Sequence, residues 1–136
     1  MKKLFVSVPM KNRTEENIRN SIEKMHKIAE IVFGEELEVI DSYNEFDVPD
    51  CKNQAIRCLG KSIEKLAEAD YFIGINYSEI FKGCRLENQI AHEYGIKSFF
   101  VELGMFPDAL DVEQNWWRNM EVETKFPKAV CDNANR

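Results

Sequence analysis

The chain has 136 residues and a net charge of −6 at pH 7, and 44% of its residues are hydrophobic while 31% are charged. This length predicts a single domain, 1–136, built on one core, because domains commonly contain about 100 to 150 residues. The composition excludes a disordered or membrane-spanning chain, and an acidic balance without any basic block argues against a nucleic-acid partner.

Short apolar runs alternate with amphipathic stretches along the first part of the chain. Residues 4–8 form an apolar run that stops at Pro9 and is typical of a buried parallel strand. Thr14 is a suitable N-cap for a helix that ends at Gly34. Apolar residues recur along this helix at helical spacing: Ile18, Ile22, Met25, Ala29 and Val32. A second buried strand is predicted at 37–40.

The same alternation continues to residue 103. A second helix carries the apolar stripe Ile56, Leu59, Ile63 and Leu66, and a third strand is predicted at 71–75. A third helix, 86–94, presents Leu86, Ile90 and Tyr94 on one side and stops at Gly95, before a fourth strand at 96–103. This order predicts an α/β fold with a doubly wound, flavodoxin-like or Rossmann-like parallel sheet of four to five strands, in the order 2-1-3-4. Ligands then bind where the strand order reverses, at the carboxyl ends of the first and third strands.

The pattern weakens from Gly104 onward, so 104–136 is predicted to be a less regular extension of the domain. Pro107 precedes a short helix expected at 108–120, which carries Trp116 and Trp117. Adjacent residues face different sides of a helix, so one tryptophan is free to cover the core while the other meets a partner subunit. The alternative is that both pack on their own domain.

The cysteines and histidines indicate neither a metal site nor a cofactor. The four cysteines contain no C-x-x-C pair, and the two histidines supply no ligand cluster at zinc spacing. We expect reduced, structural thiols. The N-terminal apolar run is too short for a signal peptide, which favours a cytoplasmic protein.

Glu87 is the strongest candidate for a nucleophile. It follows the third predicted strand and the loop glycine Gly83, close to the start of the third predicted helix. A carboxylate in that position points to the rim where open α/β sheets bind ligands, beside free N–H groups of the helix terminus. The alternative is that Glu87 is only a favourable acid in a first helical turn.

Several blocks of sequence resemble one known superfamily. They are Val8-Pro9-Met10 after the first predicted strand, Ala69-Asp70 before the third, and the series Gly83, Glu87, Ala91 and Gly95. Their order and spacing resemble the nucleoside 2-deoxyribosyltransferase-like superfamily over about residues 3–102. The blocks Pro9-Met10-Lys11-Asn12-Arg13, Asp41-Ser42-Tyr43, Leu59-Gly60-Lys61-Ser62 and Gly83-Cys84-Arg85-Leu86-Glu87 are most similar to a branch of small bacterial and phage proteins.

The resemblance implies an activity, a substrate and an assembly. Enzymes of this superfamily cleave the N-glycosidic bond of a nucleoside or nucleotide, and Glu87 matches the glutamate that attacks the anomeric carbon. A carboxylate suits this chemistry because it forms a covalent glycosyl intermediate and splits one difficult step into two. The implied substrate is a nucleoside or a nucleoside 5′-monophosphate, no cofactor is required, and a homodimer or larger homo-oligomer is expected.

The chain departs from the superfamily pattern at two acidic positions. Phe81 stands where relatives carry an acid before the loop glycine, and Lys61-Ser62 stands where they carry one in the second helix. Glu79 or Asp41 can replace the missing general acid only if the fold brings one of them close to the leaving base. A non-catalytic nucleotide-binding or sensor module with the same fold is therefore the alternative function.

Cations at several positions suggest a phosphate group on the substrate. Arg13, Lys61 and Arg85 come from three segments that we expect at the crevice, and a guanidinium matches phosphate geometry. The alternative is that Lys61 and Arg85 are solvated surface charges. The other candidates are Ser7 and Ser62 for a sugar or phosphate, Asn12 and Asn76 for a base, Tyr43 for stacking, and Pro9, Met10, Asp41 and Gly83 as further substrate contacts.

Overall fold

The computed structural model describes residues 1–10, 13–42, 51–76 and 81–106. Within these residues four strands form one parallel sheet in the order β2-β1-β3-β4, which confirms the predicted fold class and strand order. The strands are β1 (Lys2–Val6), β2 (Leu37–Val39), β3 (Tyr71–Ile75) and β4 (Lys97–Val101). The helices between them are α1 (Glu15–Phe33), α2 (Gln54–Leu66) and α3 (Lys82–Glu93). The predicted helix at 108–120, with its two tryptophans, lies outside the described residues.

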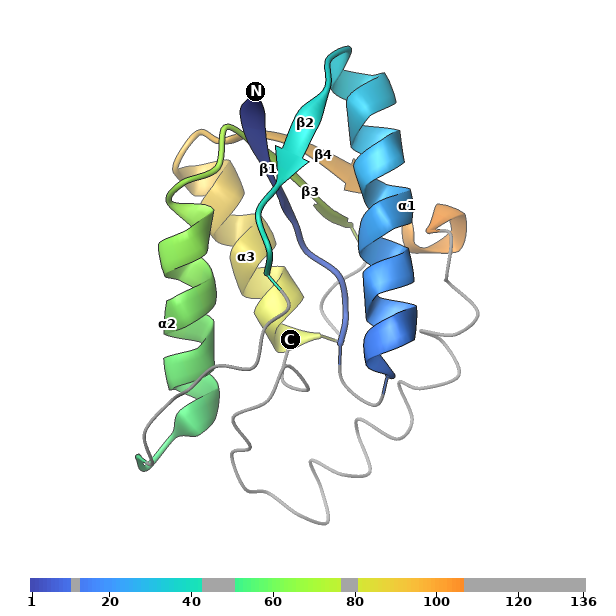
Figure 1. Ribbon diagram of the computed structural model, residues 1–136. Coiled ribbons are helices and arrows are strands. Elements are labelled where there is room, and N and C mark those ends of the chain that lie inside the picture. Colours follow the sequence, from blue (N-terminus) through green and yellow to red (C-terminus); the bar gives the residue numbers. More distant parts are fainter. Residues whose placement is uncertain (11–12, 43–50, 77–80, 107–136) are drawn as a thin grey trace.

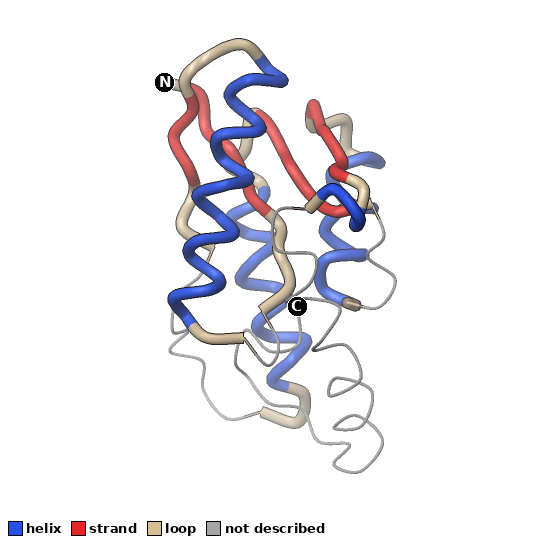
Figure 2. Tube along the Cα trace, turned by 90° about the vertical axis from the view of Figure 1, so that its right-hand side faces the viewer, coloured by secondary structure: helices blue, strands red, loops and turns tan. Residues whose placement is uncertain are grey.

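The helices cover both faces of the sheet. Figures 1 and 2 show α1 on one face and the pair α2 and α3 on the other. The core is divided accordingly, because alternate residues of a strand point to opposite faces. Leu4, Val6 and Ile73 pack with residues of α1, whereas Phe5 and Phe72 pack with residues of α2 and α3. This arrangement leaves the carboxyl ends of the strands together at one edge.

Helix α1 has the ends that its sequence predicts. The Thr14 hydroxyl accepts a hydrogen bond from the Asn17 backbone N–H at 3.1 Å, which satisfies one of the free donors of the first turn. Gly34 ends the helix with a φ of 73°, a left-handed conformation that costs glycine little. Ile18, Met25 and Ala29 are buried on the sheet, as predicted.

Strand β1 begins and ends two residues earlier than predicted. The strand covers Lys2–Val6 rather than residues 4–8, because the apolar run continues beyond the ladder as buried chain. The backbone N–H of Ser7 still donates to the Ile73 carbonyl at 2.9 Å. Strand β4 ends at Val101, before a 3-10 turn, η1 (Leu103–Met105), instead of running to residue 103.

Helix α3 begins earlier than predicted, and small residues form most of its buried side. It starts at Lys82, so Glu87 lies in the second turn and not in the first, where no acid is found. The buried side consists of Gly83, Cys84, Glu87 and Ala91, while Tyr94 is 80% exposed. Three of these four residues are small and allow the helix backbone to approach the strands closely, because little side-chain volume separates them.

Side chains of α1 cover the outward backbone groups of Leu37, the first residue of β2. The backbone N–H of Leu37 donates to Glu30 Oε2 at 2.9 Å, and the Leu37 carbonyl lies 2.7 Å from His26 Nε2. A carbonyl oxygen only accepts hydrogen bonds, so His26 Nε2 carries the proton. Both backbone groups that Leu37 directs away from β1 are therefore satisfied.

The cysteines of the described residues differ in oxidation state. Cys51 and Cys84 are free, as predicted, but Cys58 is disulfide-bonded, so the expectation of a reduced thiol is wrong at that position.

Across the described part of the chain, none of the helices has the length and apolar character needed to cross a bilayer.

Candidate functional site

The centre of the candidate site is a buried contact between Ser7 and Glu87. Ser7 follows β1, and its hydroxyl donates to Glu87 Oε1 at 2.7 Å across 80 residues of sequence. Both side chains are 0% exposed. Burying a carboxylate is costly unless polar groups compensate for the lost water, and the Ser7 hydroxyl is one such group.

The residue after Glu87 fixes α3 against β3. Asn88 Nδ2 donates to the Ile75 carbonyl at 2.8 Å, at the end of β3. Gly74 lies directly beneath this side chain: a methyl group there would overlap Asn88 Oδ1 and lie 2.8 Å from Cε1 of Phe72. The absence of a side chain at Gly74 therefore allows the close approach that sets the position of Glu87.

Arg13 holds the chain that leaves β1. Its Nη1 donates to the Pro9 carbonyl at 2.8 Å, and its Nη2 donates to Ser21 Oγ at 2.6 Å and to the Asn17 carbonyl at 3.4 Å. Its backbone N–H also donates to the Met10 carbonyl at 3.2 Å. The guanidinium thus ties this turn to the start of α1, and a phosphate would have to displace these contacts.

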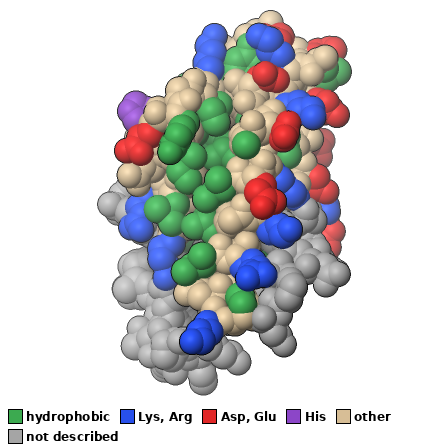
Figure 3. All heavy atoms as spheres, turned by 90° about the vertical axis from the view of Figure 1, so that its left-hand side faces the viewer, with side chains coloured by type: hydrophobic (Ala, Val, Ile, Leu, Met, Phe, Trp, Pro, Cys, Tyr) green, Lys and Arg blue, Asp and Glu red, His purple; other side chains and the backbone are tan. Residues whose placement is uncertain are grey.

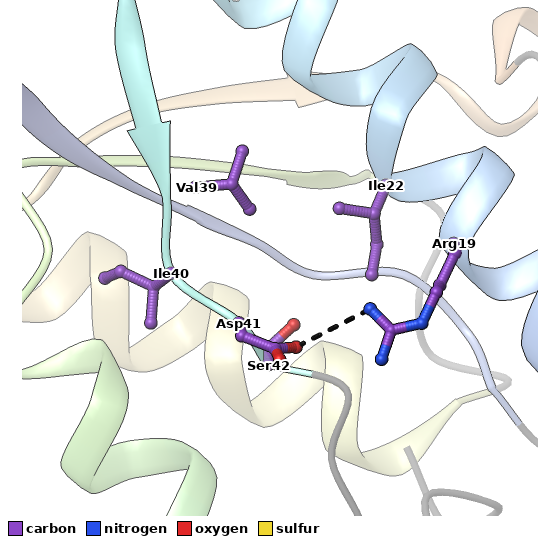
Figure 4. A pocket seen from close by; sticks show the side chains of 6 residues that line it. All are labelled: Arg19, Ile22, Val39, Ile40, Asp41 and Ser42. Carbon is purple, nitrogen blue, oxygen red and sulfur yellow. Dashed lines mark ion pairs between the residues drawn. The ribbon is translucent and has the colours of Figure 1, made fainter.

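The chain that leaves β2 forms one wall of a pocket of about 300 Å³. Figure 4 shows Arg19 and Ile22 of α1 facing Val39 and the segment that carries Asp41 and Ser42. Arg19 Nη1 lies 4.0 Å from Asp41 Oδ1, and the two side chains are 49% and 65% exposed. Ser42 is buried, and its hydroxyl donates to the Val6 carbonyl at 3.3 Å.

The remaining predicted site residues are more dispersed. Asn76 follows β3, but its Nδ2 donates to Glu102 Oε1 at 2.8 Å. Lys61 and Arg85 are exposed, and within the described residues neither side chain has a hydrogen bond or ion pair. Ser62 and Gly83 are buried in α2 and α3. Asn12, Tyr43 and the alternative acid Glu79 lie outside the described residues.

The described residues contain no group of three or more His, Cys, Asp or Glu side chains that could hold a metal ion. The polar groups of the site are instead hydroxyls, amides, single carboxylates and the guanidinium groups of Arg13 and Arg19. Such a mixture of donors and acceptors suits the binding of an organic ligand through hydrogen bonds.

Sequence reasoning missed several residues that shape the site. Asn88 and Ser42 each contact the end of a neighbouring strand, and Arg19 and Ile22 line the pocket. The spacing of three residues between Arg19 and Ile22 could have indicated that both side chains lie on the same side of the helix. Asn88 and Ser42 gave no local signal, because their partners are distant in sequence.

The comparisons with known proteins identify no relative. No protein-family model, curated protein or solved structure matches the chain. The resemblance to nucleoside 2-deoxyribosyltransferase-like proteins therefore stays a prediction that depends on the sequence blocks alone.

Proposed function

We propose that this protein binds a nucleoside or nucleoside 5′-monophosphate at the carboxyl edge of its sheet and cleaves the N-glycosidic bond with Glu87 as the nucleophile. The observation that carries the proposal is the position of Glu87, hydrogen-bonded by Ser7 at 2.7 Å beside the reversal of strand order. Open α/β sheets bind ligands at this point. The proposal also depends on the sequence resemblance.

The reaction begins when a carboxylate oxygen of Glu87 attacks the anomeric carbon. The new C–O bond forms as the C–N bond breaks, and the bonding electrons leave with the base nitrogen, which takes a proton from a general acid. Water then attacks the glycosyl ester, transfers a proton to the base catalyst and releases the free sugar. A second base in place of water completes a transfer reaction instead.

Ser7 has the geometry to hold the nucleophile in one orientation. A hydroxyl that donates to a carboxylate forms a hydrogen bond worth about 1.5 to 3 kcal/mol. This bond limits rotation of the Glu87 side chain and holds one carboxylate oxygen next to the end of β1. Precise placement of the attacking group contributes to rate because it removes orientational freedom before the reaction.

If the substrate carries a phosphate group, Arg85 and Lys61 are the side chains that bind it. Both side chains are exposed, and Arg85 lies in the first turn of α3, where backbone N–H groups also favour an anion. Arg13 is less suited to this role because its guanidinium already contacts Pro9, Asn17 and Ser21. We therefore assign Arg13 to holding the loop.

A second candidate function is a nucleotide-binding module without turnover. The 0% exposure of Glu87 favours it, because a nucleophile must reach its substrate and this carboxylate is covered in the structure. Phe81, which stands where relatives carry an acid, favours it as well. In this module the buried Ser7–Glu87 contact serves only to hold α3 against the end of β1.

One assay separates the two functions. Purified protein is incubated with deoxynucleosides and their 5′-monophosphates, and free base is followed by chromatography. We expect base release by the wild type, loss of at least about a hundredfold in rate for Glu87→Gln, and no loss for Glu93→Gln, an exposed acid of the same helix. Base release that survives Glu87→Gln excludes Glu87 as the nucleophile. Thermal stabilisation by a monophosphate without base release favours the binding module.

We also propose that two copies associate through α2 and α3. On α3, Tyr94 is 80% exposed, and Leu86 and Ile90 are only partly buried. On α2, Ile56 is 65% exposed. Figure 3 shows hydrophobic side chains gathered in the middle of this face, with charged groups around them, as in many protein interfaces.

A further inference from the structure

We propose that Cys58 forms a disulfide with Cys131 of the same chain, and that this bond opens and closes with the redox state of the surroundings. The sequence contains four cysteines. Cys51 and Cys84 are free, and Cys58 is disulfide-bonded. Cys131, which lies outside the described residues, is therefore the cysteine that remains as its partner. The inference is independent of the proposed function, because none of the four thiols has a role in it.

Cys58 holds its end of the bond inside the fold. It lies in the second turn of α2 and is only 5% exposed, on the same buried side of the helix as Ser62 and Leu66. Figure 1 shows that α2 starts beyond the carboxyl ends of the strands and runs back along the sheet. A sulfur held by a helix against the core is a fixed anchor, so a bond to it restrains the chain at residue 131.

The chain between the described fold and residue 131 is long enough to reach this anchor. The last described residue, Phe106, is 3% exposed and packs in the core on the α1 side of the sheet, whereas α2 covers the other side. About 25 residues separate Phe106 from Cys131, and an extended chain of that length spans up to about 80 Å, more than the diameter of a domain of this size. The bond therefore requires no movement of either anchor.

The other cysteines and the expected compartment favour a bond that responds to redox conditions. Cys51 is exposed and remains free, so oxidation is selective for Cys58 and does not affect every accessible thiol. The sequence favours the cytoplasm, where persistent disulfides are rare and those that form are mostly transient or redox-sensing. A disulfide in such a protein is therefore expected to be reversible.

Glutathione disulfide is the oxidant that closes the bond. One protein thiolate attacks a sulfur of glutathione disulfide, whose S–S bond breaks as a mixed disulfide forms and one glutathione thiolate leaves. The second protein thiolate attacks the mixed disulfide, releases the second glutathione and forms the bond between Cys58 and Cys131. The two protein thiols thereby lose two electrons and two protons, which the two glutathione thiols receive. Reduced glutathione reverses both steps.

The closed bond restrains a large part of the fold. The loop between its two cysteines contains β3, α3 and β4, so about 70 residues lose freedom in the unfolded chain. A disulfide stabilises mainly through this restriction, and more so for longer loops. We expect the closed form to melt about 10 °C or more above the open form. The redox state of the surroundings thus controls the stability of the fold.

Peptide mapping tests the pairing. The purified protein is equilibrated with excess glutathione disulfide, alkylated, digested with trypsin and analysed by mass spectrometry without a reductant. We expect a linked pair of peptides, 58–61 and 129–136, with Cys51 and Cys84 outside it. A bond from Cys58 to any other cysteine, an unlinked Cys58, or a linked pair found only in covalent dimers on a non-reducing gel would overturn the inference.

Thermal unfolding at defined ratios of reduced to oxidised glutathione tests reversibility. The wild type is expected to melt about 10 °C or more higher in excess oxidised glutathione than at the ratio of a reducing cytosol. Cys131→Ser is expected to remove this difference, whereas Cys51→Ser, at an exposed free thiol, is expected to retain it. A bond that stays closed at the cytosolic ratio, or a difference that survives Cys131→Ser in a folded protein, overturns the inference.

Discussion

Replacing Gly74 with alanine tests whether the close approach of α3 to β3 positions Glu87. The added methyl group would overlap Asn88 Oδ1 and lie 2.8 Å from Cε1 of Phe72, a ring that is 0% exposed. Neither neighbour moves freely, because Asn88 donates to the Ile75 carbonyl and Phe72 stacks on Phe5. The helix must therefore shift away from the strand.

The cost follows from two contributions. Overpacking of a tight core costs about 1 to 3 kcal/mol, and loss of the Asn88 hydrogen bond costs about 0.5 to 1.5 kcal/mol. We expect Gly74→Ala to lower the free energy of unfolding by about 2 to 4 kcal/mol, a large part of the 5 to 15 kcal/mol that holds a typical domain together. The same shift is expected to lengthen the contact between Ser7 and Glu87.

Urea denaturation followed by circular dichroism, at equal protein concentrations, measures this change. Gly60→Ala is a matched control in α2, because a methyl group there meets nothing within 4 Å. It is expected to stabilise the protein by about 0.5 to 1 kcal/mol, since alanine is the better helix former. The double variant Gly74→Ala/Asn88→Ala is expected to recover part of the loss, because one of the two clashing groups is removed.

Two outcomes would refute the reasoning. One is a Gly74→Ala protein within about 0.5 kcal/mol of the wild type, a change typical of surface substitutions. The other is a double variant whose loss equals or exceeds the sum of the two single losses, which would mean that Asn88 and the new methyl group do not compete for space.

Three further predictions concern other parts of the molecule. Arg13→Met removes three hydrogen bonds from the turn after β1 and is expected to cost about 2 to 4 kcal/mol in urea denaturation; a loss below 1 kcal/mol argues against its holding role. The hydroxyl of Tyr71 donates to Glu35 at 2.6 Å, and this hydrogen bond is the main reason that the pKa of Tyr71 is raised above 10.0. The folded state then holds this proton more tightly than the unfolded state, so stability falls as the pH rises above 10; Tyr71→Phe should make this fall shallower, and an unchanged slope would contradict the assignment. Tyr94→Lys is expected to shift the protein from dimer to monomer in light scattering, and a wild type that is already monomeric removes the basis for the proposed interface.

Local signals were sufficient for much of the fold. Thr14 and Gly34 marked the ends of α1, because caps act within one turn of the chain. The alternation of strands and helices was sufficient for the sheet order, because handedness leaves few topologies. The start of α3 was missed because its first residue follows Phe81, which provides no side-chain cap, and because Gly83 resembled a loop residue.

The candidate site was harder to predict because its contacts are long-range. Ser7 and Glu87 were both named from the sequence, but nothing local indicated that they meet across 80 residues. The side of α3 that lies against the sheet was not assigned from the sequence: the small residues are buried there, Ile90 is partly buried against the same core, and Tyr94 is exposed. The periodicity of a sequence shows which side of a helix is apolar. The space between the helix and the sheet decides which side of the helix packs against the strands.

The side chains of His26 and Glu30 that cover Leu37 have a consequence for behaviour at high concentration. A strand from another molecule that approached β2 would find both outward backbone groups of Leu37 already engaged, so this rim is a poor template for fibrillar growth. The strand at the opposite edge of the sheet, β4, begins at Lys97. The charged side chain of Lys97 would lose water if a strand of another molecule paired there. Crowded solutions of this protein should therefore resist the cross-strand stacking that leads to amyloid.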